Sequence, residues 1–305
     1  MVELSPSGTS TYRRLLHLSD PHLTTSGIDK DGVNASVSLQ QMLNDVGHLL
    51  PVDAVIVSGD ITDDGSIGGY RQALELVTGF AMAHGIPSVF SAGNHDQRQN
   101  FIEVLGSGHR GADGSDNGTA MPSTDERAAF SDLNGLRVIT VDSLVPGHAH
   151  GHISKEQLAW LRNVLATLAN SRTVLVLHHP PISVPRHPMR KMMLDNPDDL
   201  ADVIAGTDVC AVISGHLHHQ LAGSLAGIPV WVTPGIVTRI DTASPPTLIR
   251  GVLGAAATII DLVDGSPIFR IIQARDPRSG EQVYLCDALS GEAVESEDIT
   301  FEGAP

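Results

Sequence analysis

Five short apolar runs in this sequence each end in side chains that can bind metal ions. The runs span residues 15–19, 55–58, 87–90, 173–177 and 209–213, and runs of this length are typical of buried strands. Between them, apolar residues at 39, 42, 43, 46, 49 and 50 follow the spacing of a helix with one buried face, as do those of residues 70–83. Strands that alternate with helices imply parallel strands joined by βαβ crossovers, which indicates an α/β fold.

The polar side chains that follow these runs are carboxylates, imidazoles and an amide. Because the carboxyl ends of parallel strands can converge in one crevice, ligands far apart in the sequence can meet there. This mixed set of nitrogen and oxygen ligands suits Mn, Fe, Zn or Co better than Ca or Mg alone. The positions therefore predict a metal site, and its motif residues are Asp20, His22, Asp60, Asn94, His95, Asp96, His178, His179, His216 and His218.

These motifs resemble those of the calcineurin-like metallophosphoesterases, whose pattern reads D-x-H, G-D, G-N-H-[DE], H and G-H-x-H. All five blocks occur in order from Asp20 to His218, over about two-thirds of the 305 residues. Residues 142–148, the turn 177–181 and the spacing of the last block look most like bacterial class III cyclic nucleotide phosphodiesterases. The resemblance implies a four-layer α-β-β-α sandwich, in which two packed mixed sheets are flanked by helices.

The resemblance also implies a role for each motif residue. One divalent or trivalent transition-metal ion would be held by Asp20, His22 and His218, and a second by Asn94, His178 and His216, with Asp60 bridging both. A hydroxide bridging the ions would attack the phosphorus of a diester. His95 would be catalytic, as an acid or as a charge stabiliser, and Asp96 could hold its imidazole in one orientation. The expected substrate contacts are Asn94, His95, His148 and His218.

The expected activity is metal-dependent hydrolysis of 3′,5′-cyclic nucleotides such as cAMP to nucleoside 5′-monophosphates. Alternatives are a broad-specificity phosphodiesterase, such as a glycerophosphodiesterase or a nucleotide pyrophosphatase, a metal-free scaffold of the same fold, and a nuclease. Every ligand position is filled by a competent residue, which disfavours the scaffold. The net charge of −16 disfavours binding to nucleic acid, although two bound cations would reverse the sign at the site.

Structural roles compete with these functional ones. Asp20 and Asp60 could be helix N-caps, because aspartate commonly caps a helix that follows a strand. We expect His17 in the core and His179 beside the site without binding metal. His109 lacks a supporting motif and is expected at the surface, and the H-x-H-x-H stretch at 148–152 is expected to be a loop.

Apolar runs at 229–233, 254–263 and 268–272 predict a second sheet packed on the first. We expect an N-terminal extension over residues 1–13, a catalytic domain over 14–275 and a C-terminal extension or interface arm over 276–305. The amino terminus lacks signal-peptide features, no apolar stretch reaches membrane-spanning length, and two cysteines make no disulfide framework, so we expect a cytoplasmic protein without a membrane partner. The insertion after His178 carries Met189, Met192 and Met193, which predict a pocket rim or the interface of a homo-oligomer.

Overall fold

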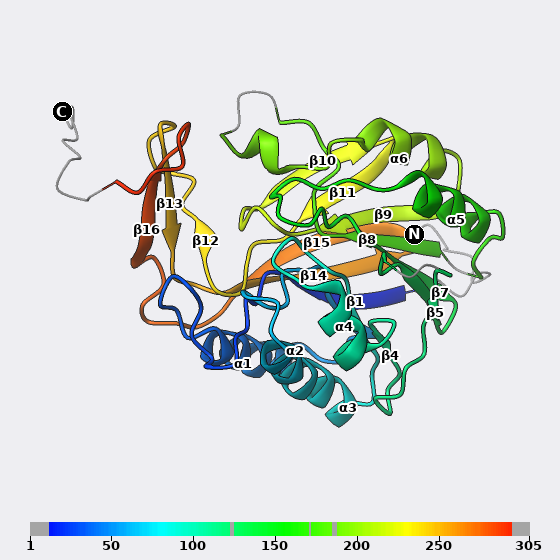
Figure 1. Cartoon of the computed structure of the whole chain (residues 1–305). Coiled ribbons are helices and arrows are strands. Elements are labelled where there is room, and N and C mark those ends of the chain that lie inside the picture. Colours follow the sequence, from blue (N-terminus) through cyan, green and yellow to red (C-terminus); the bar gives the residue numbers. More distant parts are fainter. Residues whose placement is uncertain (1–11, 123–124, 171, 185–187, 295–305) are drawn as a thin grey trace, which may run out of the picture.

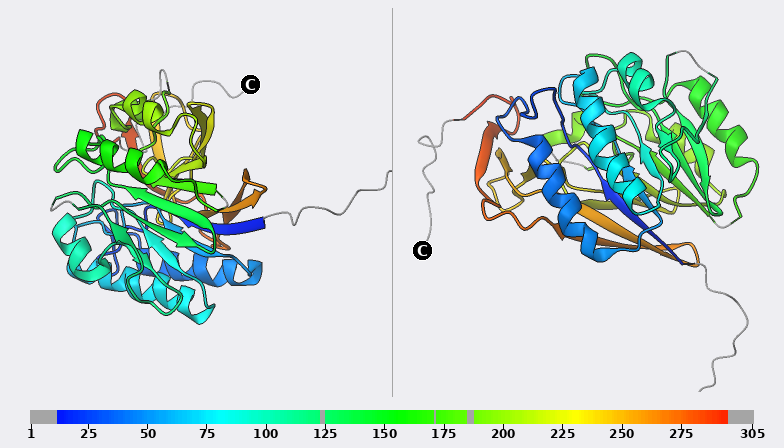
Figure 2. Two further views of the ribbon diagram at one scale, coloured as in Figure 1. Left: turned by 90° about the vertical axis from the view of Figure 1, so that its right-hand side faces the viewer. Right: turned by 90° about the horizontal axis from the view of Figure 1, so that it is seen from below.

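Two β-sheets face each other at the centre of the structure, and helices cover their outer faces (Figure 1). The computed structural model describes residues 12–122, 125–170, 172–184 and 188–294. The left view of Figure 2 shows the two helical layers on opposite sides of the paired sheets. The expected α-β-β-α arrangement is therefore confirmed.

The first sheet has a parallel centre and antiparallel edges. Strands β1, β2 and β3 run parallel, β14 pairs antiparallel with β1, and β15 and β4 pair antiparallel at the two edges. In spatial order the strands are β15 (Ser266–Gln273), β14 (Ala256–Val263), β1 (Tyr12–Leu18), β2 (Ala54–Val57), β3 (Ser88–Phe90) and β4 (His109–Arg110).

The second sheet also has a parallel centre, formed by β11, β9, β8 and β7. Antiparallel strands β10, β6 and β5 complete its edges. The spatial order is β10 (Leu221–Leu225), β11 (Ile228–Val232), β9 (Val209–Ser214), β8 (Arg172–Leu177), β7 (Leu136–Val141), β6 (Ala129–Leu133) and β5 (Thr119–Ala120).

The first helix on the first sheet begins after a side-chain cap. The side chain of Asn34 caps α1 by accepting a hydrogen bond from the backbone N–H of Val37. The segment 67–83 is helical throughout but contains a π-helical turn. The elements are α1 (Ala35–Val46), the short 3₁₀ helix η1 (Gly47–Leu49), α2 (Ile67–Ala73), the π segment η2 (Leu74–Thr78), α3 (Gly79–Ala83) and α4 (Arg98–Leu105).

The second sheet is covered by α5 (Lys155–Leu165) and α6 (Pro197–Ile204), and the short 3₁₀ helix η3 (Pro188–Met192) precedes α6. Ser154 caps α5 by accepting from the N–H of Gln157, which is one of the two hydrogen bonds of a capping box. The side chain of Gln157 instead bonds the backbone of Asp142. Among the described residues, no helix has the length and apolar character needed to cross a membrane.

Three hydrophobic cores hold these layers together. Successive residues of a strand point to opposite faces of a sheet, so one strand can contribute to two cores. Leu16 and Val55 face the helices of the first sheet, whereas Leu15 and Ile56 face the other sheet. On the second sheet, Leu175 packs under α5 and α6. Each buried strand thus contributes to two cores, which explains why the runs are apolar throughout and do not alternate.

The prediction that the C-terminal strands form a second sheet is wrong. Strand β11 joins the second sheet, but β14 and β15 pair beside β1 and complete the first sheet, so that β1 is not an edge strand. A separate three-stranded antiparallel sheet stands at the side of the sandwich, formed by β12 (Arg239–Ile240), β13 (Leu248–Val252) and β16 (Gln282–Asp287). Residues 282–287, which we assigned to a C-terminal arm, therefore belong to this third sheet; the domain boundary at 275 itself stays a prediction.

Candidate metal centre

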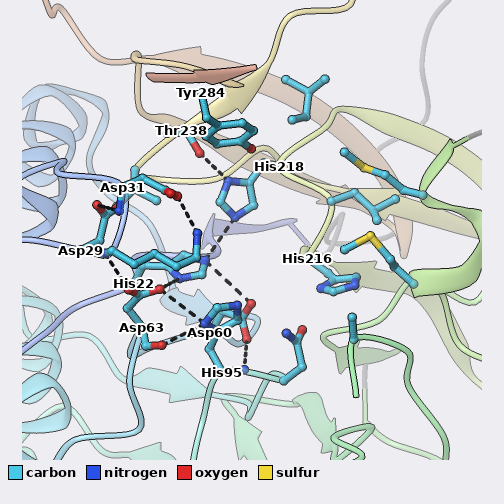
Figure 3. A pocket seen from close by; sticks show the side chains of 18 residues that line it. His22, Asp29, Asp31, Asp60, Asp63, His95, His216, His218, Thr238 and Tyr284 are labelled. Carbon is cyan, nitrogen blue, oxygen red and sulfur yellow. Dashed lines mark hydrogen bonds and ion pairs between the residues drawn. The ribbon is translucent and has the colours of Figure 1, made fainter. Parts of the chain in front are cut away.

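The predicted ligands converge at the carboxyl ends of five parallel strands. Asp20 and His22 follow β1, Asp60 follows β2, and Asn94 follows β3 in the first sheet. The second sheet contributes His178 after β8, and His216 and His218 after β9. Because the two sheets face each other, their loops meet in one pocket, where Figure 3 shows His22, Asp60, His216 and His218 turned toward a common centre.

Strained backbone places most of these side chains. Five of the seven predicted ligands have a positive φ: Asp20 (55°), His22 (44°), Asp60 (44°), His216 (72°) and His218 (49°). Residues other than glycine rarely adopt this left-handed conformation, and such residues cluster at functional sites. The neighbouring Gly59 leaves the space for His178, because a Cβ atom there would lie 2.5 Å from its Nδ1. The loops are therefore shaped to bring these side chains together.

One group of ligand atoms is formed by Asp20, His22 and His218. The Nε2 atoms of His22 and His218 lie 3.2 Å apart, and Nε2 of His218 lies 3.5 Å from a carboxylate oxygen of Asp20. The opposite nitrogens are engaged, because Nδ1 of His22 donates to Asp63 at 2.9 Å and Nδ1 of His218 bonds Thr238 at 2.7 Å. Both Nε2 atoms therefore face the shared centre, as metal-binding imidazoles do.

A second group surrounds His178. Its Nε2 atom lies 3.2 Å from Oδ1 of Asn94, 3.2 Å from Oδ2 of Asp60 and 3.1 Å from Nδ1 of His216. The same Oδ2 atom of Asp60 lies 3.8 Å from Nε2 of His22 in the first group. Asp60 thus stands between the two groups, where the sequence places the bridging ligand.

The chemistry of these atoms fits cations at both centres. Nδ1 of His178 donates to the carbonyl of Ser58, so its Nε2 faces the oxygens of Asp60 and Asn94, and a proton or a metal ion has to lie between them. Burial lowers the pKa of His178, but the charges of Asp60 and Asp20 more than offset it and raise the pKa to about 9. Carboxylates that attract a proton this strongly also attract a metal ion. The donor atoms of these side chains therefore suit two positively charged ions.

His95 projects into the pocket next to these groups. Its Nδ1 atom donates to the backbone carbonyl of Asp63 at 2.9 Å and lies 3.4 Å from the carboxylate of the same residue, so Nε2 is left for a ligand. Its backbone N–H donates to Asp60. Burial lowers the pKa of His95, whereas Asp63 and Asp60 raise it, with a net result of about 9.

Asp96 does not hold the imidazole of His95, contrary to our expectation. Its carboxylate is buried and accepts hydrogen bonds from the backbone N–H groups of Ile61, Thr62 and Gly93, so it fastens the Asp60 loop to the Asn94 loop. The His95 imidazole instead bonds Asp63, which none of the sequence motifs includes. The spacing G-D-x-x-D after β2 contains the only sequence signal for it.

Other histidines are placed as follows. His17 is buried and bonds Ser58, as expected for a core residue. His179 is buried beside the site with Nδ1 bonded to Ser143, and His148 lies in a loop with its ring 5.0 Å from that of His150. His148 is exposed and does not line the pocket, whereas its neighbour Ala149 does, so the structure gives no support to a substrate contact by His148.

His109 is not at the surface. It belongs to β4 and is buried between the sheets, where its two ring nitrogens bond the hydroxyls of Ser131 and Thr140 at 2.7 and 3.0 Å. Burial lowers its pKa to about 4, so the ring is neutral. The glycine-rich sequence around it concealed this strand.

Comparison with known proteins agrees with the geometry. The profile of the calcineurin-like phosphoesterase family matches residues 13–220, so the chain belongs to this family. The chain is 40% identical over 219 residues to a probable cyclic nucleotide phosphodiesterase of Rhodococcus erythropolis, covering 72% of this chain and 69% of the relative. It is 37% identical over 245 residues to a cAMP/cGMP dual specificity phosphodiesterase of Mycobacterium tuberculosis, covering 79% and 73%.

Solved structures support the same fold. Purple acid phosphatase from yellow lupin has a TM-score of 0.53 at 14% identity, covering 94% of this chain and 53% of its own. The chain thus spans about half the length of the lupin protein. GAP50, the anchor in the inner membrane complex of Plasmodium, has a TM-score of 0.55 at 11% identity, covering 90% and 88%.

Proposed function

We propose that this protein hydrolyses 3′,5′-cyclic nucleotides, cAMP among them, to nucleoside 5′-monophosphates. The observation that carries the proposal is the convergence of carboxylate, imidazole and amide side chains at two adjoining centres, with five of the seven predicted ligands lining one pocket, in a chain whose relatives are named as cyclic nucleotide phosphodiesterases. The cavity measures about 200 Å³, which suits a small molecule better than a polymer.

The proposed ligand sets follow the two groups of atoms. One metal ion would be held by Asp20, His22 and His218, the other by Asn94, His178 and His216, with Asp60 shared between them. When bound, the two ions would activate water for attack on phosphorus and neutralise charge on the phosphoryl oxygens. Manganese, iron, zinc and cobalt all suit these donors.

The protein's own contribution to the reaction centres on His95. With Nδ1 fixed on the carbonyl of Asp63, the Nε2 atom is free to carry its proton toward the substrate. Hydrolysis of the cyclic diester breaks the bond between phosphorus and O3′, and O3′ must then receive a proton. Nε2–H of His95 could donate that proton, or could stabilise charge on a phosphoryl oxygen by the same hydrogen bond.

The proposal is tested by the substrate spectrum of the metal-loaded protein. We expect Mn-loaded protein to convert cAMP and cGMP to 5′-monophosphates faster than it cleaves a glycerophosphodiester or a nucleotide pyrophosphate. Product identity is read by ³¹P NMR, and Asp60→Asn serves as the inactive control. Turnover of the linear diesters without turnover of cyclic nucleotides would replace this proposal with a broad-specificity phosphodiesterase.

A cytoplasmic location and a homo-oligomeric state are proposed from the sequence alone. Sedimentation velocity of the full chain would test the second, because a homo-oligomer sediments faster than a monomer of 32.2 kDa.

A further inference from the structure

The pocket has two chemically different walls around the metal ligands. One wall carries the charged side chains of Asp29, Lys30 and Asp31. The other wall is apolar and contains Met189 and Met192 of the 3₁₀ helix η3. A phosphate ester that binds at the metals has to direct the rest of its structure along one of these walls or between them.

Tyr284 brings the third sheet into this pocket. It lies on β16, more than sixty residues beyond the last metal motif, yet its ring lines the same pocket as His218. Figure 3 shows Tyr284 beside Thr238 and above His218. The sequence pattern gave this residue no role, because β16 follows all of the family motifs.

The position of the Tyr284 ring is fixed by its neighbours. Tyr284 is the cross-strand partner of Gly251 on β13, and a Cβ atom on Gly251 would collide with the ring, so the aromatic face packs against bare backbone. Its side chain also lies beside Thr238, whose hydroxyl bonds His218 (Figure 3). The ring is therefore held in place before a ligand arrives.

Met189 also contacts the loop that carries His218. It packs in a small hydrophobic cluster with Leu217, the residue between His216 and His218. The aromatic ring and the thioether thus both line the pocket beside one histidine loop. Met193, which we grouped with these methionines, belongs to the cluster but does not line the pocket.

We propose that Tyr284 is a specificity-determining residue that binds the nucleobase of the substrate by stacking, with Met189 and Met192 as the opposing apolar surface. This proposal rests on the proposed function for its substrate class. Aromatic rings and polarisable thioethers form favourable contacts with flat heterocycles, whereas the carboxylates of Asp29 and Asp31 do not. The phosphate would lie at the ligand cluster and the base over the His218 loop.

Equilibrium dialysis of metal-loaded protein against AMP and against inorganic phosphate tests the subsite. Both probes carry the phosphate, but only AMP carries a nucleoside. We expect Tyr284→Leu to weaken AMP binding about 5- to 150-fold, the range that ~1–3 kcal/mol of base–aromatic stacking produces, while phosphate binding stays constant. Tyr284→Phe keeps the ring and should bind AMP nearly as the unaltered protein does. Tyr12→Leu, which removes a tyrosine outside the pocket, is the matched control.

Each result has a defined meaning. Unchanged AMP binding in Tyr284→Leu overturns the proposal. Equal loss of AMP and phosphate binding, or the same loss in Tyr284→Phe, also overturns it, because Tyr284 would then act only by positioning His218 through Thr238. If Tyr284→Leu does not fold, Gly251→Ala is the alternative variant, because its added methyl group displaces the Tyr284 ring without removing it. Selective loss of AMP binding in Gly251→Ala supports the proposal, and unchanged AMP binding refutes it.

The test does not depend on turnover, so it separates this inference from the proposed function. A protein that binds AMP through Tyr284 but does not cleave cyclic nucleotides would keep the nucleobase subsite and lose the proposed activity. A protein that cleaves cAMP with equal affinity for AMP in Tyr284→Leu would keep the activity and lose the subsite.

Discussion

Replacement of Asp63 by asparagine tests the structural account of the metal centre most directly. One carboxylate oxygen of Asp63 accepts from Nδ1 of His22 at 2.9 Å and lies 3.4 Å from Nδ1 of His95, while the other accepts from the backbone N–H of Lys30 at 2.8 Å. Burial opposes the charge, but hydrogen bonds from His22 and His95 hold the pKa of Asp63 well below its usual range. Asp63 is therefore ionised and in contact with both a ligand and the candidate catalytic histidine.

The size of the effect follows from those contacts. Asparagine can still accept from His22 through its carbonyl, but its amide group would then face the N–H of Lys30, donor against donor. A hydrogen bond to a charged group contributes about 1.5–3 kcal/mol, and loss of such a partner to a metal-binding histidine typically costs about 10- to 100-fold in metal affinity or activity. We expect Asp63→Asn to lose metal affinity and kcat within that range.

Metal affinity is measured by competition with a chromogenic chelator, and activity by turnover of cAMP. Asp64→Asn is the matched control, because Asp64 is exposed and its carboxylate accepts from the backbone N–H of Ser66, away from the ligands. If Asp63→Asn and Asp64→Asn bound metal with equal affinity, the support of His22 by Asp63 would have no energetic significance and our description of the centre would be wrong.

Three further predictions concern single residues. Asp60→Asn removes the charge between the two ligand groups, and elemental analysis should find fewer metal ions per chain; full occupancy would exclude a bridging role. His95→Gln should retain its metal while kcat falls ~10²- to 10⁴-fold, and loss of metal would instead make His95 a structural support. His109 has a folded-state pKa of about 4, below the value of about 6.5 expected in the unfolded chain, so its stabilising effect is complete above the higher value and is lost as the pH falls toward the lower. In urea unfolding, the free energy of unfolding should therefore fall by up to about 3 kcal/mol less on acidification in His109→Gln than in the unaltered protein. Identical dependence of this free energy on pH in the two proteins would refute the prediction.

The convergence of the predicted ligands was foreseeable because each motif follows a buried strand, whereas the assignment of ligands to two ions came from the family resemblance. Apolar runs reveal strands, and parallel strands present their carboxyl ends at one edge, so residues such as Asp20 and His178 could be placed together without coordinates. Asp63 was harder to identify because its role depends on which way the imidazoles of His22 and His95 turn. The periodic spacing of apolar residues in the sequence carries no information on the orientation of an imidazole ring.

The errors in the fold came from strand pairing. Residues 254–263 were correctly predicted as a strand, but its apolar pattern does not specify which neighbour it pairs with, and β14 pairs beside β1. The role of Asp96 was misjudged because adjacency to His95 in sequence says nothing about which N–H groups its carboxylate reaches. Tyr284 was missed because β16 is connected to the pocket only through the third sheet.

The division of the ligands between two sheets has a consequence for the stability of the folded chain. Asp20 and His22 extend from one sheet and His218 from the other, so this ligand set exists only while the sheets are packed together. An ion bound there links the two sheets, and it binds the folded chain but not the unfolded one. Its stabilisation grows with free metal, reaching about 2.7 kcal/mol at a hundred times the Kd. Metal supply is thus expected to set the resistance of the protein to proteolysis, in addition to switching its chemistry on.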